Sequence, residues 1–137
     1  MYRIETNTFL LEFIPEIHEQ DFAYPVNTDL AVKVSSYGYS ADTFMEVGVQ
    51  WIAEFAIQLK KLYESLNGAA RLEEPYNVNN YIEFIAETGG HIRVRGCLNN
   101  KNAFGYTQEI TFENEIDQTY LRDFVNRLLA YFGRYAE

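Results

Sequence analysis

The chain has 137 residues, 47% of them hydrophobic and 16% aromatic, and its net charge is −9. This length fits one domain over residues 1–137 with a substantial core. The charge disfavours nucleic acid as a partner, because affinity for phosphates needs clustered Lys and Arg. The single Cys97 excludes an internal disulfide and favours a reducing, cytoplasmic compartment. With no apolar stretch long enough to span a bilayer, we expect no membrane partner.

The first third of the chain shows strand patterns. Residues 2–14 predict a strand that is apolar on much of both faces and ends at Pro15. A loop is expected over residues 16–28. Alternating apolar residues then predict a half-buried strand over residues 30–36 and a further strand over residues 39–47, with Tyr37 and Gly38 at the turn.

Two segments carry helical periodicity. The first covers residues 48–66, and Gly68 is the expected left-handed cap. The second starts after Asp117, the expected N-cap, with Thr119 as the alternative. Its apolar stripe comprises Leu121, Phe124, Val125, Leu128, Phe132 and Tyr135.

A strand-rich stretch lies between the helices. A short strand over residues 69–74 ends at Pro75, and residues 77–80 are expected to form a turn. Three antiparallel strands then follow over residues 81–87, 91–98 and 106–113. The last connection, residues 99–105, is expected to be long and mobile.

The first hairpin of these three strands has a predictable register. A two-residue Gly-Gly loop would pair Ala86 with Arg93 and mix the apolar and polar faces. A three-residue loop of Thr88, Gly89 and Gly90 instead pairs apolar with apolar residues. This loop makes Glu87 and His91 cross-strand neighbours, and Gly90 supplies its left-handed residue. The other expected pairs are Ala86 with Ile92, Phe84 with Val94, and Glu83 with Arg95.

These elements predict an α+β fold with a largely antiparallel sheet of about six to seven strands. The predicted order is β-β-β-α-β-β-β-β-α, with both helices packed on one face of the sheet. The apolar face that carries them is expected to contain Ile82, Phe84, Ile92, Val94, Ile110 and Phe112.

The opposite, polar face carries alternating charges and is the predicted partner-binding surface. The last connection is expected to bring two of its glutamates, Glu109 and Glu113, close to its two arginines. The predicted surface comprises Glu83, Glu87, Arg93, Arg95, Glu109 and Glu113.

No motif for catalysis, cofactor binding or metal binding occurs in the sequence, so none of these sites is predicted. His91 beside Glu87 fits an oriented base, but a surface pair next to a tight turn is favoured. The acidic loop around His18 has the composition of a binding site for a cation or a basic protein. A loop that only contacts solvent is the favoured interpretation. Cys97 is interpreted as a passive thiol.

Three segments together point to a family. GHIRVRGCL (residues 90–98) resembles a GHI-x-V-x-G-x-L strand, and ITFENEIDQTYLRDFVNRL (residues 110–128) resembles a final strand, a helix start and the last helix. LKKLYESLNGAARLE resembles the preceding passage from helix to strand. In this order they resemble WapI-type immunity proteins, small bacterial proteins that neutralise the toxic C-terminal domain of a cell-wall-associated contact-dependent toxin. The resemblance covers roughly the last two thirds of the chain.

The resemblance implies a non-enzymatic inhibitor that binds a cognate toxin domain, with a nuclease as one candidate. An acidic inhibitor would associate quickly with a basic nuclease through electrostatic steering. Two alternatives stay open. One is a structural or regulatory α+β module, perhaps homodimeric through an uncovered sheet face, and the other is a small enzyme that uses carboxylates of the polar face.

Overall fold

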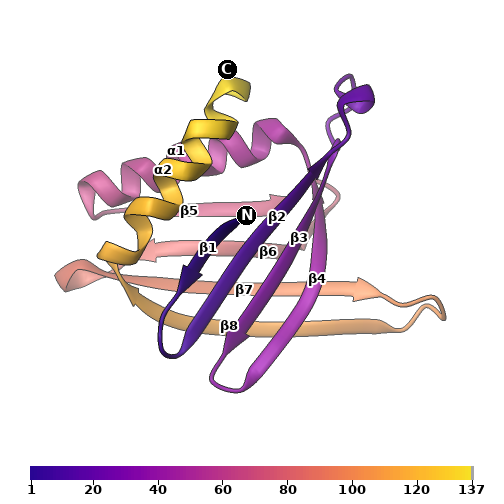
Figure 1. Cartoon of the computed structure of the whole chain (residues 1–137). Coiled ribbons are helices and arrows are strands. Elements are labelled where there is room, and N and C mark those ends of the chain that lie inside the picture. Colours follow the sequence, from indigo (N-terminus) through magenta and orange to yellow (C-terminus); the bar gives the residue numbers. More distant parts are fainter. Residues whose placement is uncertain (137) are drawn as a thin grey trace.

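The computed structural model describes residues 1–136, which form an α+β fold with two helices and two four-stranded antiparallel sheets. We call the sheets A and B (Figure 1). Sheet A contains β1 (Tyr2–Glu5), β2 (Phe9–Ile17), β3 (Thr28–Ser36) and β4 (Tyr39–Val47). Sheet B contains β5 (Ala69–Glu74), β6 (Asn77–Ala86), β7 (His91–Lys101) and β8 (Thr107–Asp117). The helices are α1 (Val49–Ser65) and α2 (Leu121–Phe132).

The two sheets and the two helices share one core. In Figure 1 the strands of sheet A run steeply across those of sheet B, and α1 and α2 lie together along one side. The ring of Phe124 on α2 packs 5.6 Å from Phe13 of sheet A and 6.3 Å from Phe84 of sheet B, measured between ring centroids. Phe55 on α1 lies 5.9 Å from Phe84. Aromatic side chains therefore join all the layers.

The prediction of α+β structure is confirmed, but the prediction of one sheet of six to seven strands is wrong. The strands form two sheets because β4 and β5, which flank α1 in the chain, do not pair with each other. The eighth strand comes from a turn inside residues 2–14. The hydroxyl of Thr6 accepts hydrogen bonds from the backbone N–H groups of Thr8 (3.2 Å) and Phe9 (3.1 Å). This side-chain turn reverses the chain, so β1 pairs antiparallel with β2 instead of continuing into it.

The prediction that Pro15 ends the strand is also wrong, because β2 continues to Ile17. β1 pairs with β2 only as far as Phe13, which lies opposite Tyr2. Pro15 therefore lies beyond the end of β1, where β2 is an edge on that side. A missing backbone N–H disrupts no ladder there.

The predicted register of the hairpin formed by β6 and β7 is confirmed. Phe84 pairs with Val94 and Glu83 with Arg95, and the backbone N–H of Glu87 donates to the carbonyl of His91 at 2.8 Å. The loop Thr88–Gly90 has left-handed backbone at both of its glycines. The turn predicted at residues 77–80 is wrong, since β6 already begins at Asn77 after a reversal at residues 75–76.

The last hairpin is longer than expected. β7 continues to Lys101 and β8 begins at Thr107, so the connection is only residues 102–106. From Leu98 onward β7 pairs with β8 alone. We call residues 100–108 the arm, which projects from the body beyond β4 (Figure 1).

The helix ends differ in part from the predictions. Asp117 is an N-cap as predicted, because its Oδ1 accepts from the N–H of Thr119 at 2.9 Å, in a 3₁₀ turn that leads into α2. The left-handed cap of α1 is Leu66 (φ 53°), not Gly68, and its N–H donates to the carbonyl of Leu62 at 2.7 Å. Gly68 is left-handed too (φ 89°), in the turn to β5.

The apolar face of sheet B was predicted to carry both helices. In the structure the helices cover only part of this face, and sheet A covers the rest. α1 packs on α2 and, among the strands, mainly on β5, while α2 packs on α1 and β1. At the β8 side, sheet A covers the face, with Phe9 of β2 lying 6.1 Å from Phe112 between ring centroids. The outer faces of both sheets are thus the broad surfaces that the helices leave uncovered.

Candidate functional site

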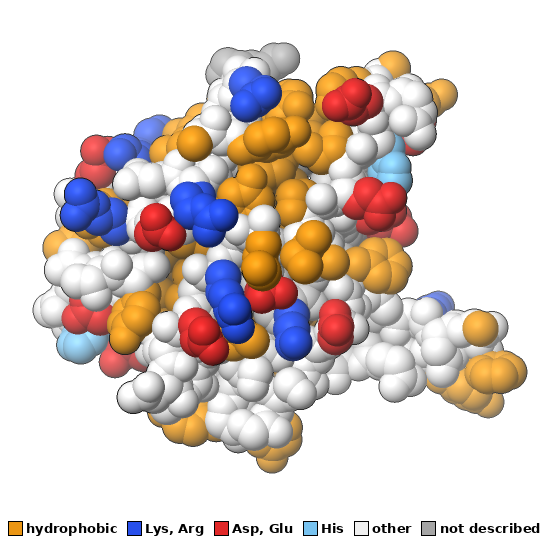
Figure 2. Space-filling model, viewed as in Figure 1, with side chains coloured by type: hydrophobic (Ala, Val, Ile, Leu, Met, Phe, Trp, Pro, Cys, Tyr) orange, Lys and Arg blue, Asp and Glu red, His pale blue; other side chains and the backbone are white. Residues whose placement is uncertain are grey.

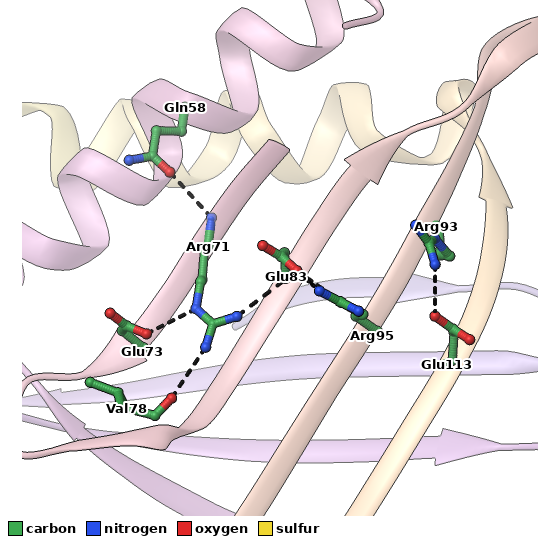
Figure 3. A network of polar contacts seen from close by, with 8 residues as sticks. All are labelled: Gln58, Arg71, Glu73, Val78, Glu83, Arg93, Arg95 and Glu113. Carbon is green, nitrogen blue, oxygen red and sulfur yellow. Dashed lines mark hydrogen bonds and ion pairs between the residues drawn. The ribbon is translucent and has the colours of Figure 1, made fainter. Parts of the chain in front are cut away.

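The outer face of sheet B holds a row of alternating charges across all its strands. Arg71, Glu83, Arg95 and Glu113 lie opposite one another on β5, β6, β7 and β8 (Figure 3). Nε and Nη2 of Arg95 each lie 2.8 Å from Oε1 of Glu83, and Nη1 of Arg71 lies 3.9 Å from the same oxygen. The hydrogen bond to Glu83 raises the pKa of Arg95. The row is internally neutralised.

Most of the residues predicted as the partner surface join this network. Nε of Arg93 lies 2.8 Å from Oε1 of Glu87, although its N–H does not point along that contact. Nη1 of Arg93 donates to Glu113 at 3.2 Å. The prediction that Glu109 lies near the arginines is wrong. Its strand neighbour is Asn99, toward the arm, because β8 runs on past the arginines.

The outer face of sheet A carries a similar neutral row. Arg3, Glu12, Lys33 and Asp42 lie opposite one another across β1, β2, β3 and β4. Nε of Arg3 is 3.6 Å from Oε2 of Glu12. Figure 2 views this face, where blue and red side chains alternate across its lower middle. Opposite charges on neighbouring strands stabilise a sheet by roughly 0.2–1 kcal/mol a pair.

Two residues further along these strands, the outer face of sheet A becomes apolar. Ile14, Ala31 and Phe44 lie opposite one another on β2, β3 and β4, and we call them the apolar row. Ile14 is 50% exposed and Phe44 is 43% exposed. Large apolar side chains therefore face water in the middle of the sheet.

In the next row on the outer face of the same three strands, all the side chains are carboxylates. Glu16, Asp29 and Glu46 lie opposite one another, and we call them the acidic row. Glu74 at the end of β5 adjoins it. Burial is the main cause that raises the pKa of Glu74; a hydrogen bond with the backbone of Glu46 lowers this pKa, and the charge of Glu46 raises it. Like charges placed directly opposite each other destabilise a sheet. The acidic row thus differs from the neutral rows of both sheets.

His18 brings a positive charge to the acidic row when it is protonated. Its Nε2 lies 3.0 Å from Oδ2 of Asp29. This hydrogen bond is the main cause that raises the pKa of His18 above its ordinary value of 6.5, and the charges of Asp29, Glu16 and Asp21 add to the rise. A solvated loop was the favoured prediction around His18, whereas in the structure this side chain is hydrogen-bonded to Asp29 of β3.

Replacing Asp29 by asparagine is expected to lower the pKa of His18 toward 6.5. A raised pKa in the folded state means that the pair stabilises the fold below the unfolded pKa, and that this contribution is lost as the pH rises through the folded pKa. NMR titration of the two histidine rings measures the change. Glu115→Gln is the matched control, because Glu115 pairs with His91 (3.6 Å) and not with His18. An unchanged His18 pKa in Asp29→Asn would contradict the assignment.

The arm lies next to β4. The side-chain amide of Asn100 donates to the hydroxyl of Thr43 and, at 3.2 Å, to the carbonyl of Phe44. A groove of about 360 Å³ separates the arm from the first half of β4. At the tip of the arm, Phe104 is 85% exposed and Tyr106 is 69% exposed. The arm thus extends the exposed apolar surface beyond the edge of sheet A.

The other residues considered for chemistry are scattered. His91 lies beside Glu115 instead of pairing its ring with Glu87. Cys97 is half-buried on the outer face of sheet B, with the amide of Asn99 3.8 Å from its sulfur. Within residues 1–136, no three His, Cys, Asp or Glu side chains gather closely enough to hold a metal ion. Nor does either described helix have the length and apolarity needed to cross a bilayer.

The acidic row was not predicted from the sequence, because residue 16 was expected in a loop, residue 29 lay before the predicted strand, and the first strands were not paired. Alternation offers a usable signal. Asp29 and Glu46 take the polar positions of their strands, and Glu16 takes that position once β2 is extended past Pro15. In the neutral row of sheet B, the pair of Glu83 with Arg95 was predicted because the hairpin register follows from the Gly-Gly turn, whereas Arg71 was not predicted to join it.

Comparison with known proteins places this small α+β protein, with two open sheet faces, among immunity proteins. The model of the immunity protein WapI-like family matches residues 4–136. The chain belongs to this family, and the match extends well beyond the last two thirds to which the sequence resemblance was traced. Searches of curated proteins and of solved structures found no match.

Proposed function

We propose that this protein is an immunity protein that neutralises a bacterial toxin domain by binding it directly, without catalysing a reaction. The observation that carries the proposal is membership of the WapI-like immunity family over residues 4–136. The compartment we propose is the cytoplasm, which the single Cys97 favours.

The charge of the chain supports a basic toxin domain. The net charge of −9 complements a protein that itself binds nucleic-acid phosphates, and such proteins carry clustered Lys and Arg. Opposite net charges steer two proteins together and raise their association rate. A nuclease domain is therefore the toxin class that we propose.

Co-expression tests the proposal. The toxin domain encoded next to this gene is expressed in a bacterial host with and without the chain. We expect the chain to restore growth and to co-purify with the toxin domain, whereas an unrelated acidic protein of similar size does neither. Continued killing, despite soluble expression of the chain, would contradict the proposed function.

Light scattering addresses the homodimer alternative. The chain has a mass of 16.0 kDa, and the proposed inhibitor binds its toxin as a monomer. A mass of twice that value, persisting on dilution and in the absence of toxin, would instead support a homodimeric module. The same measurement on the co-purified complex gives its stoichiometry.

A further inference from the structure

The acidic row has a feature that folding alone does not account for. Glu16 and Glu46 flank Asp29 on both sides, and His18 is the one ion-pair partner that residues 1–136 provide to these three carboxylates. The corresponding rows of both sheets alternate in sign. Three like charges side by side work against pairing of β2, β3 and β4. A basic partner would turn this repulsion into attraction.

The apolar row lies directly beside the acidic row. Ile14 and Phe44 are each about half exposed, with Ala31 between them. A group of apolar side chains next to charged ones is the composition of a protein-binding surface, in which an apolar centre is surrounded by a polar rim. Figure 2 shows hydrophobic side chains on this face between the alternating charges and the acidic side chains near a histidine.

The arm borders the same surface. Asn100 holds its base against the backbone of Phe44, which is itself a member of the apolar row. The tip carries the exposed rings of Phe104 and Tyr106. Exposed aromatic side chains are typical anchors in protein interfaces. The apolar row and the acidic row thus lie along the second half of β4, and the arm lies beside its first half and reaches Phe44.

We propose that a basic face of the toxin domain docks on the outer face of sheet A, with its Lys and Arg side chains on the acidic row and its apolar contacts on the apolar row. This inference rests on the proposed function and names the surface that performs it. The competing surface is the outer face of sheet B, where the charges already pair with one another. An internally paired row offers less uncompensated charge to a partner.

The charge test uses two variants of the full chain. One is Glu16→Lys with Glu46→Lys on sheet A. The charge-matched control is Glu109→Lys with Glu113→Lys on sheet B; because it also breaks the pair of Glu113 with Arg93, its melting temperature is measured to show that it is folded. Each substitution changes the charge by two units, so both variants shift the net charge from −9 to −5. The sheet A variant places opposite charges beside Asp29, so it is expected to melt no lower than wild type.

Stopped-flow association with the toxin domain of the co-expression test gives the result. We expect the sheet A variant to associate slower by on the order of 100-fold at low ionic strength, and the control by less than about threefold. Equal slowing of both variants, or slowing of the control alone, would overturn the inference while leaving the proposed function in place. Failure of the wild-type chain itself to bind overturns the proposed function.

A second pair of variants tests the apolar row. Ile14→Ala with Phe44→Ala is expected to raise the dissociation rate on the order of 10-fold or more, with little change in the association rate. Leu66→Ala is the control, because Leu66 is exposed at the end of α1, away from sheet A. A dissociation rate equal to wild type in the double variant would overturn the role of the apolar row.

Discussion

Replacing Phe124 by alanine is expected to lower the free energy of unfolding by about 3–5 kcal/mol. The ring is buried on α2 and contacts Phe13 of sheet A and Phe84 of sheet B at the same time. Its loss leaves a cavity where three layers meet. The rigid strands on two sides cannot all move in to fill it, so the cost includes the cavity as well as the lost burial.

Urea denaturation followed by circular dichroism measures this effect. The matched control is Phe104→Ala, the same chemical change at the exposed tip of the arm. The control is expected to change the stability by less than about 0.5 kcal/mol. A Phe124→Ala protein as stable as the control would contradict the position of this ring at the junction of the layers.

Replacing Asn27 by alanine is expected to cost about 2–3 kcal/mol. Asn27 is buried, and its Oδ1 accepts from the N–H of Val49, the first residue of α1, at 3.0 Å. The same oxygen accepts from the hydroxyl of Thr28 at 3.0 Å, and Nδ2 donates to the carbonyl of Tyr24 at 3.1 Å. Alanine therefore leaves a helix N–H, a hydroxyl and a carbonyl without a partner.

Asn27→Asp separates the cap from the other bonds. The carboxylate keeps both acceptor interactions at the positive end of the α1 dipole but cannot donate to Tyr24. We expect it to retain more stability than Asn27→Ala, with hydrogen exchange at Val49 close to wild type. If alanine proved no more destabilising than aspartate, the acceptor role of Asn27 would be excluded.

The sequence predicted the middle of sheet B well, because local constraints agree there. The Gly-Gly turn permits few registers, and only one of them keeps Phe84 opposite Val94 on the apolar side. The strands over 39–47 and 69–74 were predicted with the bounds that the structure has. Alternation, Gly and Pro are all read within a few residues, so they need no knowledge of distant contacts.

Predictions from local sequence patterns were wrong where the course of the chain depends on one side-chain hydrogen bond or on pairing with a strand distant in sequence. The turn at Thr6 depends on one hydroxyl that bonds two backbone N–H groups. The polar run of residues 5–8 that holds this turn was included in the strand predicted over residues 2–14. Pro15 stays inside β2 because β1 ends before it. The residues of the candidate site also divide into those that local sequence patterns predict and those that depend on strand pairing. The charge pairs of sheet B follow from one hairpin register, whereas the acidic row needs β2, β3 and β4 to be aligned.

The sequence by itself determined the α+β class, the two amphipathic helices, the register around Gly89 and Gly90, and the resemblance to an immunity family. Only the tertiary structure decided that the strands form two sheets, that Glu16, Asp29 and Glu46 meet in one row, and that the arm is held against Phe44. The reason is physical. Periodicity and turn residues act over a few bonds, whereas the neighbours of a charge across a sheet are set by which strands share a core.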